Sequence, residues 1–207
     1  MRLYRGEIAN ETTNEIANCK YLYCPSCNFN SPPISSISIF SNQLVHPTVA
    51  TPNITRISDL PRGQEWRVGA AVFRYQENGH YTVLLLKRAT GSHTIEWWNT
   101  PTGPVQNTDE TIDDAMRRII LEKTGLGLQG YHNIYQVASL SWGSEEQPIT
   151  KLNFVIHDRS ADIVAIRLSE FSEYQWVEEE RIDSLSIPVA MQDVIRTGFE
   201  LHRERYI

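Results

Sequence analysis

The stretch from Gly103 to Leu126 constrains the fold most strongly, because its pattern predicts a loop followed by one amphipathic helix. Apolar residues recur at the i, i+3, i+4, i+7 and i+8 spacing of a single buried stripe; they are Ile112, Ala115, Met116, Ile119 and Ile120. Thr111 and Asp114 have the spacing of a capping box at the start, and Gly125 is a typical stop. The sequence therefore predicts a helix between Thr111 and Gly125 that buries one face.

The opposite side of this helix is charged. Opposite charges recur at i, i+4 spacing and predict ion pairs worth about 0.2–0.5 kcal/mol each; the pairs are Asp113–Arg117, Asp114–Arg118 and Arg118–Glu122. Such a face is typical of an ordinary solvated surface helix. Any functional interpretation therefore depends on the neighbouring segments.

These neighbours predict strands. Upstream, residues 68–73 and 83–87 are apolar runs joined by a hairpin turn at Asn78–Gly79, and the second run is apolar on both faces, as a central strand is. Downstream, the expected strands cover residues 135–142, 151–157, 163–168 and 174–177, and a last helix runs from about residue 189 to 203. Strands alternating with helices predict an α/β protein.

This arrangement resembles the Nudix superfamily, whose box is a glycine, a loop acid and then Arg-Glu-apolar-x-Glu-Glu-x-Gly-apolar. Aligned on the helix end, Arg118 takes the arginine position and Glu122 one glutamate position. Gly125 takes the glycine position and Leu126 the last apolar one. The resemblance extends from about Arg67 to the C-terminus and implies an α/β/α sandwich with a mixed β-sheet.

The box departs from the family pattern where the family binds metal ions. In the family, helix carboxylates hold divalent ions that polarise a diphosphate; here those positions are Ile119, Glu122 and Lys123. The loop is one residue longer than usual up to Glu110, or else Asp109 takes the loop-acid position. Glu122 alone offers at most a weak magnesium or manganese site, and the Lys123 ammonium opposes it by ~1–4 kcal/mol per cation charge. We expect a largely dismantled metal site and no cofactor.

The loop before the box supplies further candidates. His93 and Glu96 are suited to act as an acid/base pair, and Trp97 and Trp98 to stack on a flat substrate or to line an apolar pocket. The structural alternatives are a solvated histidine and two packing tryptophans. Glu173 lies, with Glu170, where some relatives carry the general base.

The candidate site residues fall into three groups. We expect catalysis from Glu122, His93, Glu96 and Glu173; substrate binding by Trp97, Trp98, Arg118 and Lys123; and weak metal binding by Glu122 alone. For Glu122 the structural alternative is a salt bridge to Arg118. Asp109 and Glu110 are interpreted as helix caps.

Three functions fit this pattern. We favour a small-molecule enzyme that uses metal-independent acid/base chemistry (isomerisation, cyclisation or C–O cleavage) on an organic substrate, with activity that survives chelation. The alternative is a weakened magnesium- or manganese-dependent hydrolase of a nucleoside-diphosphate-linked compound, whose activity a chelator removes. The second alternative is a non-catalytic ligand-binding or scaffolding module, which a ligand stabilises without turnover.

Charge and hydropathy bound the partners. The net charge is −6 and no basic stripe is present, so we expect no nucleic-acid partner. The start of the chain has no signal-peptide core and no apolar run reaches membrane-spanning length, so we expect a cytoplasmic protein without a membrane partner. The expected partner is a small-molecule substrate, and homodimerisation is left open.

Residues 1–62 differ in composition from the rest and predict an irregular N-terminal extension to a Nudix-like domain at 63–207. The extension is rich in serine, proline and asparagine, with one expected edge strand at residues 34–40. Cys19, Cys24 and Cys27 include one Cys-x-x-Cys pair, and His46 is a distant fourth ligand candidate. Because a structural zinc site needs four ligands and no second pair exists, we do not expect zinc.

Overall fold

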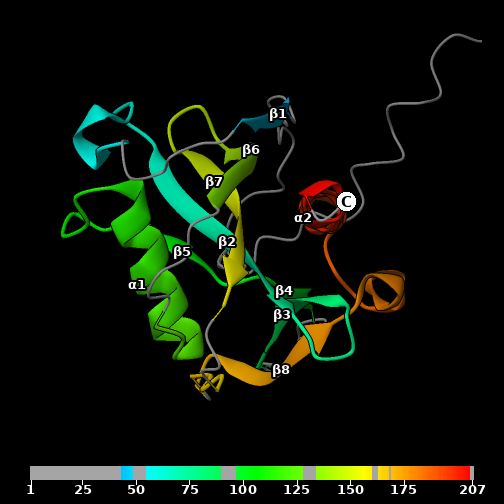
Figure 1. Cartoon of the computed structure of the whole chain (residues 1–207). Coiled ribbons are helices and arrows are strands. Elements are labelled where there is room, and N and C mark those ends of the chain that lie inside the picture. Colours follow the sequence, from blue (N-terminus) through cyan, green and yellow to red (C-terminus); the bar gives the residue numbers. More distant parts are fainter. Residues whose placement is uncertain are drawn as a thin grey trace, which may run out of the picture. The chain divides into compact units, whose positions relative to one another are not determined.

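The computed structural model describes residues 43–48 (backbone only), 55–89, 97–127, 134–159, 163–167 and 169–205. Its centre is an eight-stranded sheet in the order β1-β6-β7-β2-β3-β4, with β5 paired to β2 and β8 paired to β3 (Figure 1). The strands are β1 (Gln43–Thr48), β2 (Glu65–Tyr75), β3 (Tyr81–Arg88), β4 (Trp98–Asn99), β5 (Thr102–Pro104), β6 (Ile134–Gly143), β7 (Pro148–Asp158) and β8 (Phe171–Val177).

The sheet is mixed, as expected. β2 runs parallel to β7 over ten residue pairs from Glu65↔Ile149 to Arg74↔Asp158, whereas the other strand pairs are antiparallel. The hairpin between β2 and β3 turns at Gly79, which has a φ of 85°. β3 is buried on both faces and lies between β2 and β8, which confirms the central strand.

Two helices cover opposite faces of this sheet (Figure 1). α1 (Ile112–Thr124) packs its apolar stripe on one face, and α2 (Val189–Arg205) packs on the other. Two short 3-10 helices, η3 (Ile57–Asp59) and η4 (Glu179–Ser184), join the larger elements. The expected α/β/α sandwich is thereby confirmed. Within the described residues no helix has the length and apolarity to cross a membrane.

The ends of α1 form as the sequence predicts. The Thr111 hydroxyl accepts a bond from the Asp114 backbone N–H, and the Asp114 carboxylate accepts one from the Thr111 N–H. Gly125 ends the helix with a φ of 69°, a left-handed conformation that favours glycine. The expected Asp114–Arg118 pair is wrong, because Asp114 bonds to Thr111 and Arg118 turns to other carboxylates.

The expected strand at 163–168 is also wrong for the part that the structure describes. Residues 163–167 have no strand pairing. Instead, the Ala165 N–H donates to the Thr124 carbonyl at 2.7 Å, and the Ala165 Cβ lies 3.0 Å from where a side chain on Gly125 would begin. The segment therefore pairs with the C-terminal end of α1. Leu168 and the expected strand at 34–40 lie outside the described residues. The division at residue 62 stays a prediction, although β1 pairs with β6 from the extension side.

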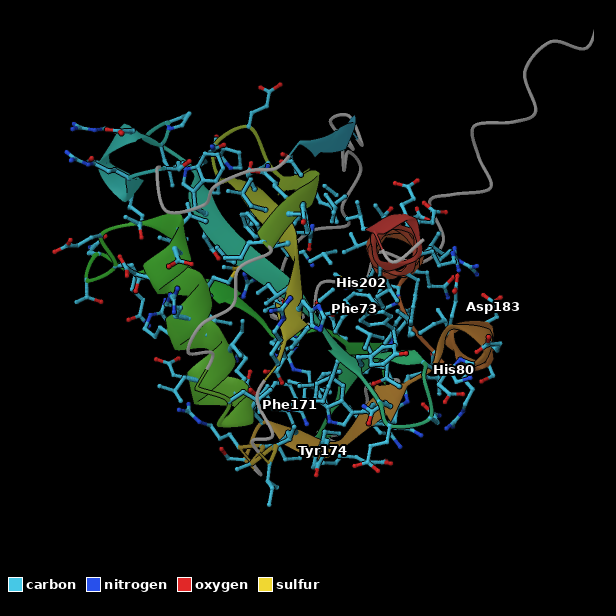
Figure 2. The ribbon with its side chains drawn as sticks, viewed as in Figure 1. Phe73, His80, Phe171, Tyr174, Asp183 and His202 are labelled. Carbon is cyan, nitrogen blue, oxygen red and sulfur yellow. The ribbon has the colours of Figure 1, made fainter. Side chains whose placement is uncertain are left out.

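A buried histidine on α2 makes the stability of this core pH-dependent. The His202 ring stacks on Tyr81 at 4.3 Å between centroids, and it lies 5.3 Å from His157 and 4.9 Å from Phe73 (Figure 2). Burial, with the nearby His157, lowers the pKa of His202 to about 4 from 6.5. Burial also lowers the pKa of His157.

Acidification should therefore destabilise the fold. The unfolded histidine takes up a proton below its pKa of 6.5 while folded His202 stays neutral, so roughly 3 kcal/mol of unfolding free energy should be lost between pH 6.5 and pH 4. Chemical denaturation at several pH values across this range measures the slope of the unfolding free energy against pH. His202→Phe should flatten the slope, whereas His80→Phe at the exposed hairpin should not. An unchanged slope in His202→Phe would contradict the assignment.

Candidate functional site

Arg118, on α1, is the centre of a polar cluster beside the loop that precedes the helix. Its guanidinium donates two bonds of 2.8 Å to the Asp109 carboxylate, one to each oxygen. It also donates to Glu122 at 3.3 Å and to the Pro104 carbonyl at 3.0 Å. One side chain thus ties together β5, the loop and the last turns of the helix.

Asp109 is the buried partner in this cluster. Its side chain is 4% exposed, and it accepts a further bond of 2.8 Å from the Gln106 N–H. The hydrogen bond from Arg118 lowers the pKa of Asp109 against the opposing effect of burial. Two charge-assisted bonds in parallel give a fixed geometry. Asp109, which the sequence indicated as a cap, therefore holds the box arginine in place.

Glu122 and Ile119 lie one turn apart on α1 but in different surroundings. The Glu122 carboxylate is 39% exposed and contacts Arg118, so its side chain reaches solvent. Ile119 is 1% exposed and belongs to the apolar core. A side chain on Gly103 would begin 3.1 Å from the Ile119 Cγ1, so the isoleucine occupies the space over this glycine. At this helix position, where the resemblance predicts a carboxylate in the family pattern, the structure has a buried hydrocarbon side chain.

Lys123 joins the helix end to the start of β8. Its ammonium lies 2.5 Å from the Glu170 Oε1 and 5.4 Å from the centroid of the Phe171 ring. The lysine side chain is 13% exposed and the glutamate side chain 29%. The positive charge of Lys123, at a position where the resemblance predicts a carboxylate, is thus balanced by an acid from outside the helix.

These residues do not fit the family's cluster of metal ions. No group of three histidine, cysteine, aspartate or glutamate side chains within the described residues is arranged to hold one ion. Glu122 is the single carboxylate among the three helix positions. It pairs with Arg118, and the next residue, Lys123, pairs with Glu170. The arrangement instead offers one partly solvated carboxylate that is paired with an arginine.

The structure places the other expected site residues apart from this cluster. Trp98 is 7% exposed and packs in the core on the α2 side, with the Lys87 ammonium 5.9 Å from its ring. Trp97 is partly buried next to it. Glu173 is 54% exposed and lies 3.8 Å from the Lys87 ammonium. His93 and Glu96 lie outside the described residues, so their roles stay predictions.

Two contacts of the cluster had only a partial signal in the sequence. Asp109 follows Gly103 at the spacing of the family's loop acid, but the same residue suits a helix cap. The sequence indicates Glu170 only as a neighbour of Glu173, because its contact with Lys123 joins residues 47 positions apart. Such a long-range pair requires the tertiary structure.

Comparison with known proteins identifies a family. The family model described as NUDIX domain matches residues 65–197, which extend from the first residue of β2 into α2. The match includes α1 and all the residues that surround Arg118. No curated protein matches the sequence.

Solved structures share the fold. A C. elegans Ap4A hydrolase in a binary complex is 18% identical, with 69% of this chain and 99% of that chain covered and a TM-score of 0.53. The NUDIX domain of Shewanella oneidensis NrtR, complexed with ADP ribose, is 18% identical, with 73% and 96% covered and a TM-score of 0.54. A MutT protein from Methanosarcina mazei is 24% identical, with 71% and 100% covered and a TM-score of 0.51. At these identities the likeness concerns the fold.

Proposed function

Because this chain belongs to the NUDIX domain family, we propose that it is a hydrolase of a nucleoside-diphosphate-linked compound. The observation that carries the proposal is the Arg118 cluster, in which the box arginine holds both the loop acid Asp109 and the box glutamate Glu122. Two similar folds support the substrate class: one is named as an Ap4A hydrolase and the other is complexed with ADP ribose.

Glu122 is the residue to which we assign the proton transfer. Hydrolysis adds the oxygen of water to phosphorus, breaks a phosphorus–oxygen bond of the diphosphate and releases a proton. A carboxylate that reaches solvent and is held by an arginine is suited to accept that proton. Asp109 acts through Arg118 and is a positioning residue.

Lys123 is the residue to which we assign diphosphate binding. Its ammonium is held beside the helix end by Glu170 and has little exposure, so its charge has a fixed place near Glu122. A phosphate oxygen that replaces Glu170 as its partner would keep the ammonium paired. We route no step through a metal ion, because the described carboxylates do not fit the family's cluster.

A second candidate is metal-independent acid/base chemistry on an organic substrate. It is favoured by the burial of Ile119 in the core and by the Lys123–Glu170 pair, which remove two carboxylates of the family pattern. It differs from the first candidate in its substrate, because a phosphoanhydride is not required. One experiment on substrate turnover can therefore distinguish the two candidate functions.

That experiment is turnover of a panel of nucleoside-diphosphate-linked compounds, with magnesium or manganese and with a chelator. We expect turnover of at least one compound, and Glu122→Gln should lower kcat by about 100-fold, the scale of a lost general base. Glu145→Gln in the exposed β6–β7 loop is the matched control and should keep wild-type kcat.

No turnover of any compound would contradict the proposal and leave the organic-substrate enzyme and the non-catalytic ligand-binding module. Turnover that Glu122→Gln leaves unchanged would contradict the role of Glu122. The reactions with chelator test whether the protein's own cations are sufficient for diphosphate hydrolysis. Activity that is lost with chelator would mean that an added metal ion supplies positive charge that Lys123 does not.

A further inference from the structure

A second polar cluster lies on the α2 side of the sheet, on the face opposite α1. Its members are Arg67 on β2, Lys151 and Asn153 on β7, and Thr102 on β5. The parallel register of β2 and β7 places Arg67 beside Lys151 and Gly69 beside Asn153. β5 completes the arrangement, because Thr102 pairs with Gly69.

Three side chains of this cluster, those of Asn153, Thr102 and Lys151, approach Gly69. An added Cβ there would lie 2.7 Å from the Asn153 Oδ1, 3.2 Å from the Thr102 Oγ1 and 3.5 Å from the Lys151 Cδ. Gly69 does not have a left-handed φ, so its backbone conformation does not require glycine. Glycine is required because a larger side chain would overlap these neighbouring atoms. The missing side chain lets the Asn153 amide, the Thr102 hydroxyl and the hydrocarbon stem of Lys151 approach one point from the two strands that flank this part of β2.

Unused hydrogen-bonding capacity distinguishes this cluster from an ordinary polar patch. Asn153 is 1% exposed, yet neither its amide nitrogen nor its amide oxygen has a hydrogen-bond partner, and the buried Arg67 Nε also has none. Lys151 is 7% exposed and makes no ion pair within the described part of the chain. Buried polar groups in native proteins are rarely left without partners.

The charge of the cluster is positive. Glu65 is the one carboxylate in ionic contact with it among the described residues, at 3.5 Å from the Arg67 Nε, and its side chain is 49% exposed. Burial and the neighbouring Arg67 lower the pKa of Lys151 to about 7. Among the described residues, the two cationic side chains are therefore balanced only by the half-exposed Glu65 carboxylate, and the Asn153 amide beside them has no partner.

We infer that Arg67, Lys151 and Asn153 form a binding site for a phosphoryl group. A phosphate oxygen would accept bonds from the guanidinium, the ammonium and the Asn153 amide, and its charge would offset the repulsion between the two cations. The Arg67 side chain is 33% exposed, so the cluster reaches solvent on that side.

The position of this site connects it to the Arg118 cluster. Thr102 directly precedes Gly103, and Pro104 pairs with Arg67 while its carbonyl accepts from Arg118. β5 thus contributes residues to both clusters, although they lie on opposite faces of the sheet. The inference that the phosphoryl group belongs to a nucleotide rests on the proposed function. The inference that the site binds phosphate does not depend on that function.

Calorimetric titration of the full-length protein with inorganic phosphate at pH 7 tests the inference. We expect saturable binding by the wild type, weakened at least about tenfold in Lys151→Met and in Arg67→Met, the scale of one lost charge-assisted bond. Arg62→Met removes an exposed charge outside the cluster and should leave the affinity unchanged. Thermal unfolding of each variant verifies that it is folded.

The inference is overturned if the wild type does not bind phosphate, or if Lys151→Met binds as the wild type does. Titration with ADP distinguishes the sources: a nucleotide phosphoryl group competes with phosphate and loses affinity in Lys151→Met, whereas an unchanged phosphate affinity in the presence of ADP indicates free phosphate. Phosphate binding without turnover of any nucleotide would contradict the proposed hydrolase and leave this site standing.

Discussion

Ile119→Glu, which restores one carboxylate of the Nudix box, is expected to lower the free energy of unfolding by about 5 kcal/mol. The reason is the surroundings of this position: Ile119 is 1% exposed, belongs to the apolar core and lies over Gly103. A glutamate there would lose its hydration without gaining a hydrogen-bond partner. Urea denaturation at pH 7 measures the loss.

Ile119→Leu is the matched control, because it keeps the volume and the apolar character, and it should cost less than about 1.5 kcal/mol. Adding magnesium to Ile119→Glu should not recover the lost stability, since Lys123 still places an ammonium at the neighbouring ligand position. Wild-type stability of Ile119→Glu, or its rescue by magnesium, would show that the core at Gly103 opens to form a metal site.

Asp109→Asn should have the second largest effect, about 4 kcal/mol of unfolding free energy. The Arg118 side chain is 19% exposed, and the substitution leaves it one acceptor oxygen at position 109 where it had two and removes its nearest counter-charge. In this variant the side-chain NH2 group at position 109 can face the Gln106 N–H. Two donors would then oppose each other unless the amide flips to present its oxygen.

Chemical denaturation of Asp109→Asn beside Asp183→Asn provides the comparison. Asp183 pairs with Arg196 at an exposed site, 70% exposed for the aspartate, where an ion pair contributes at most about 1 kcal/mol. The pKa of Asp109 is lowered in the fold, so its contribution is present above the unfolded pKa of 3.8 and is lost as the pH falls below it. Equal effects of both substitutions at pH 7 would contradict the role of Asp109.

The elements that the sequence predicted correctly are those whose signal is local. The apolar stripe, the capping box and the αL glycine of α1 lie within one short stretch, and each is a nearest-neighbour or one-turn relationship. The prediction of a strand is wrong at residues 163–167 because this segment depends on a contact that is distant in the sequence. Its apolar β-branched residues have strand propensity, but the helix end at Thr124 needed a hydrogen-bond donor, and Ala165 supplies it.

The candidate site was predicted in part for the same reason. The Arg118–Glu122 pair follows from helical spacing, whereas the stronger pair of Arg118 with Asp109 depends on how the loop folds back. Lys151 and Asn153 were missed because a strand pattern shows alternation but not which strand lies alongside. Only the parallel pairing of β7 with β2 brings them to Arg67.

The pairing of β1 with β6 affects how a shortened version of this protein would behave in solution. A chain cut at the predicted boundary and beginning at residue 63 would lack residues 43–48, which pair with β6 through Gln43↔Ser139, Leu44↔Ala138 and Thr48↔Gln136. β6 would then become an outer strand with an open row of N–H and C=O groups. Such an edge is a template for a second molecule, so self-association of the shortened protein would report a vacated strand position rather than a property of the intact chain.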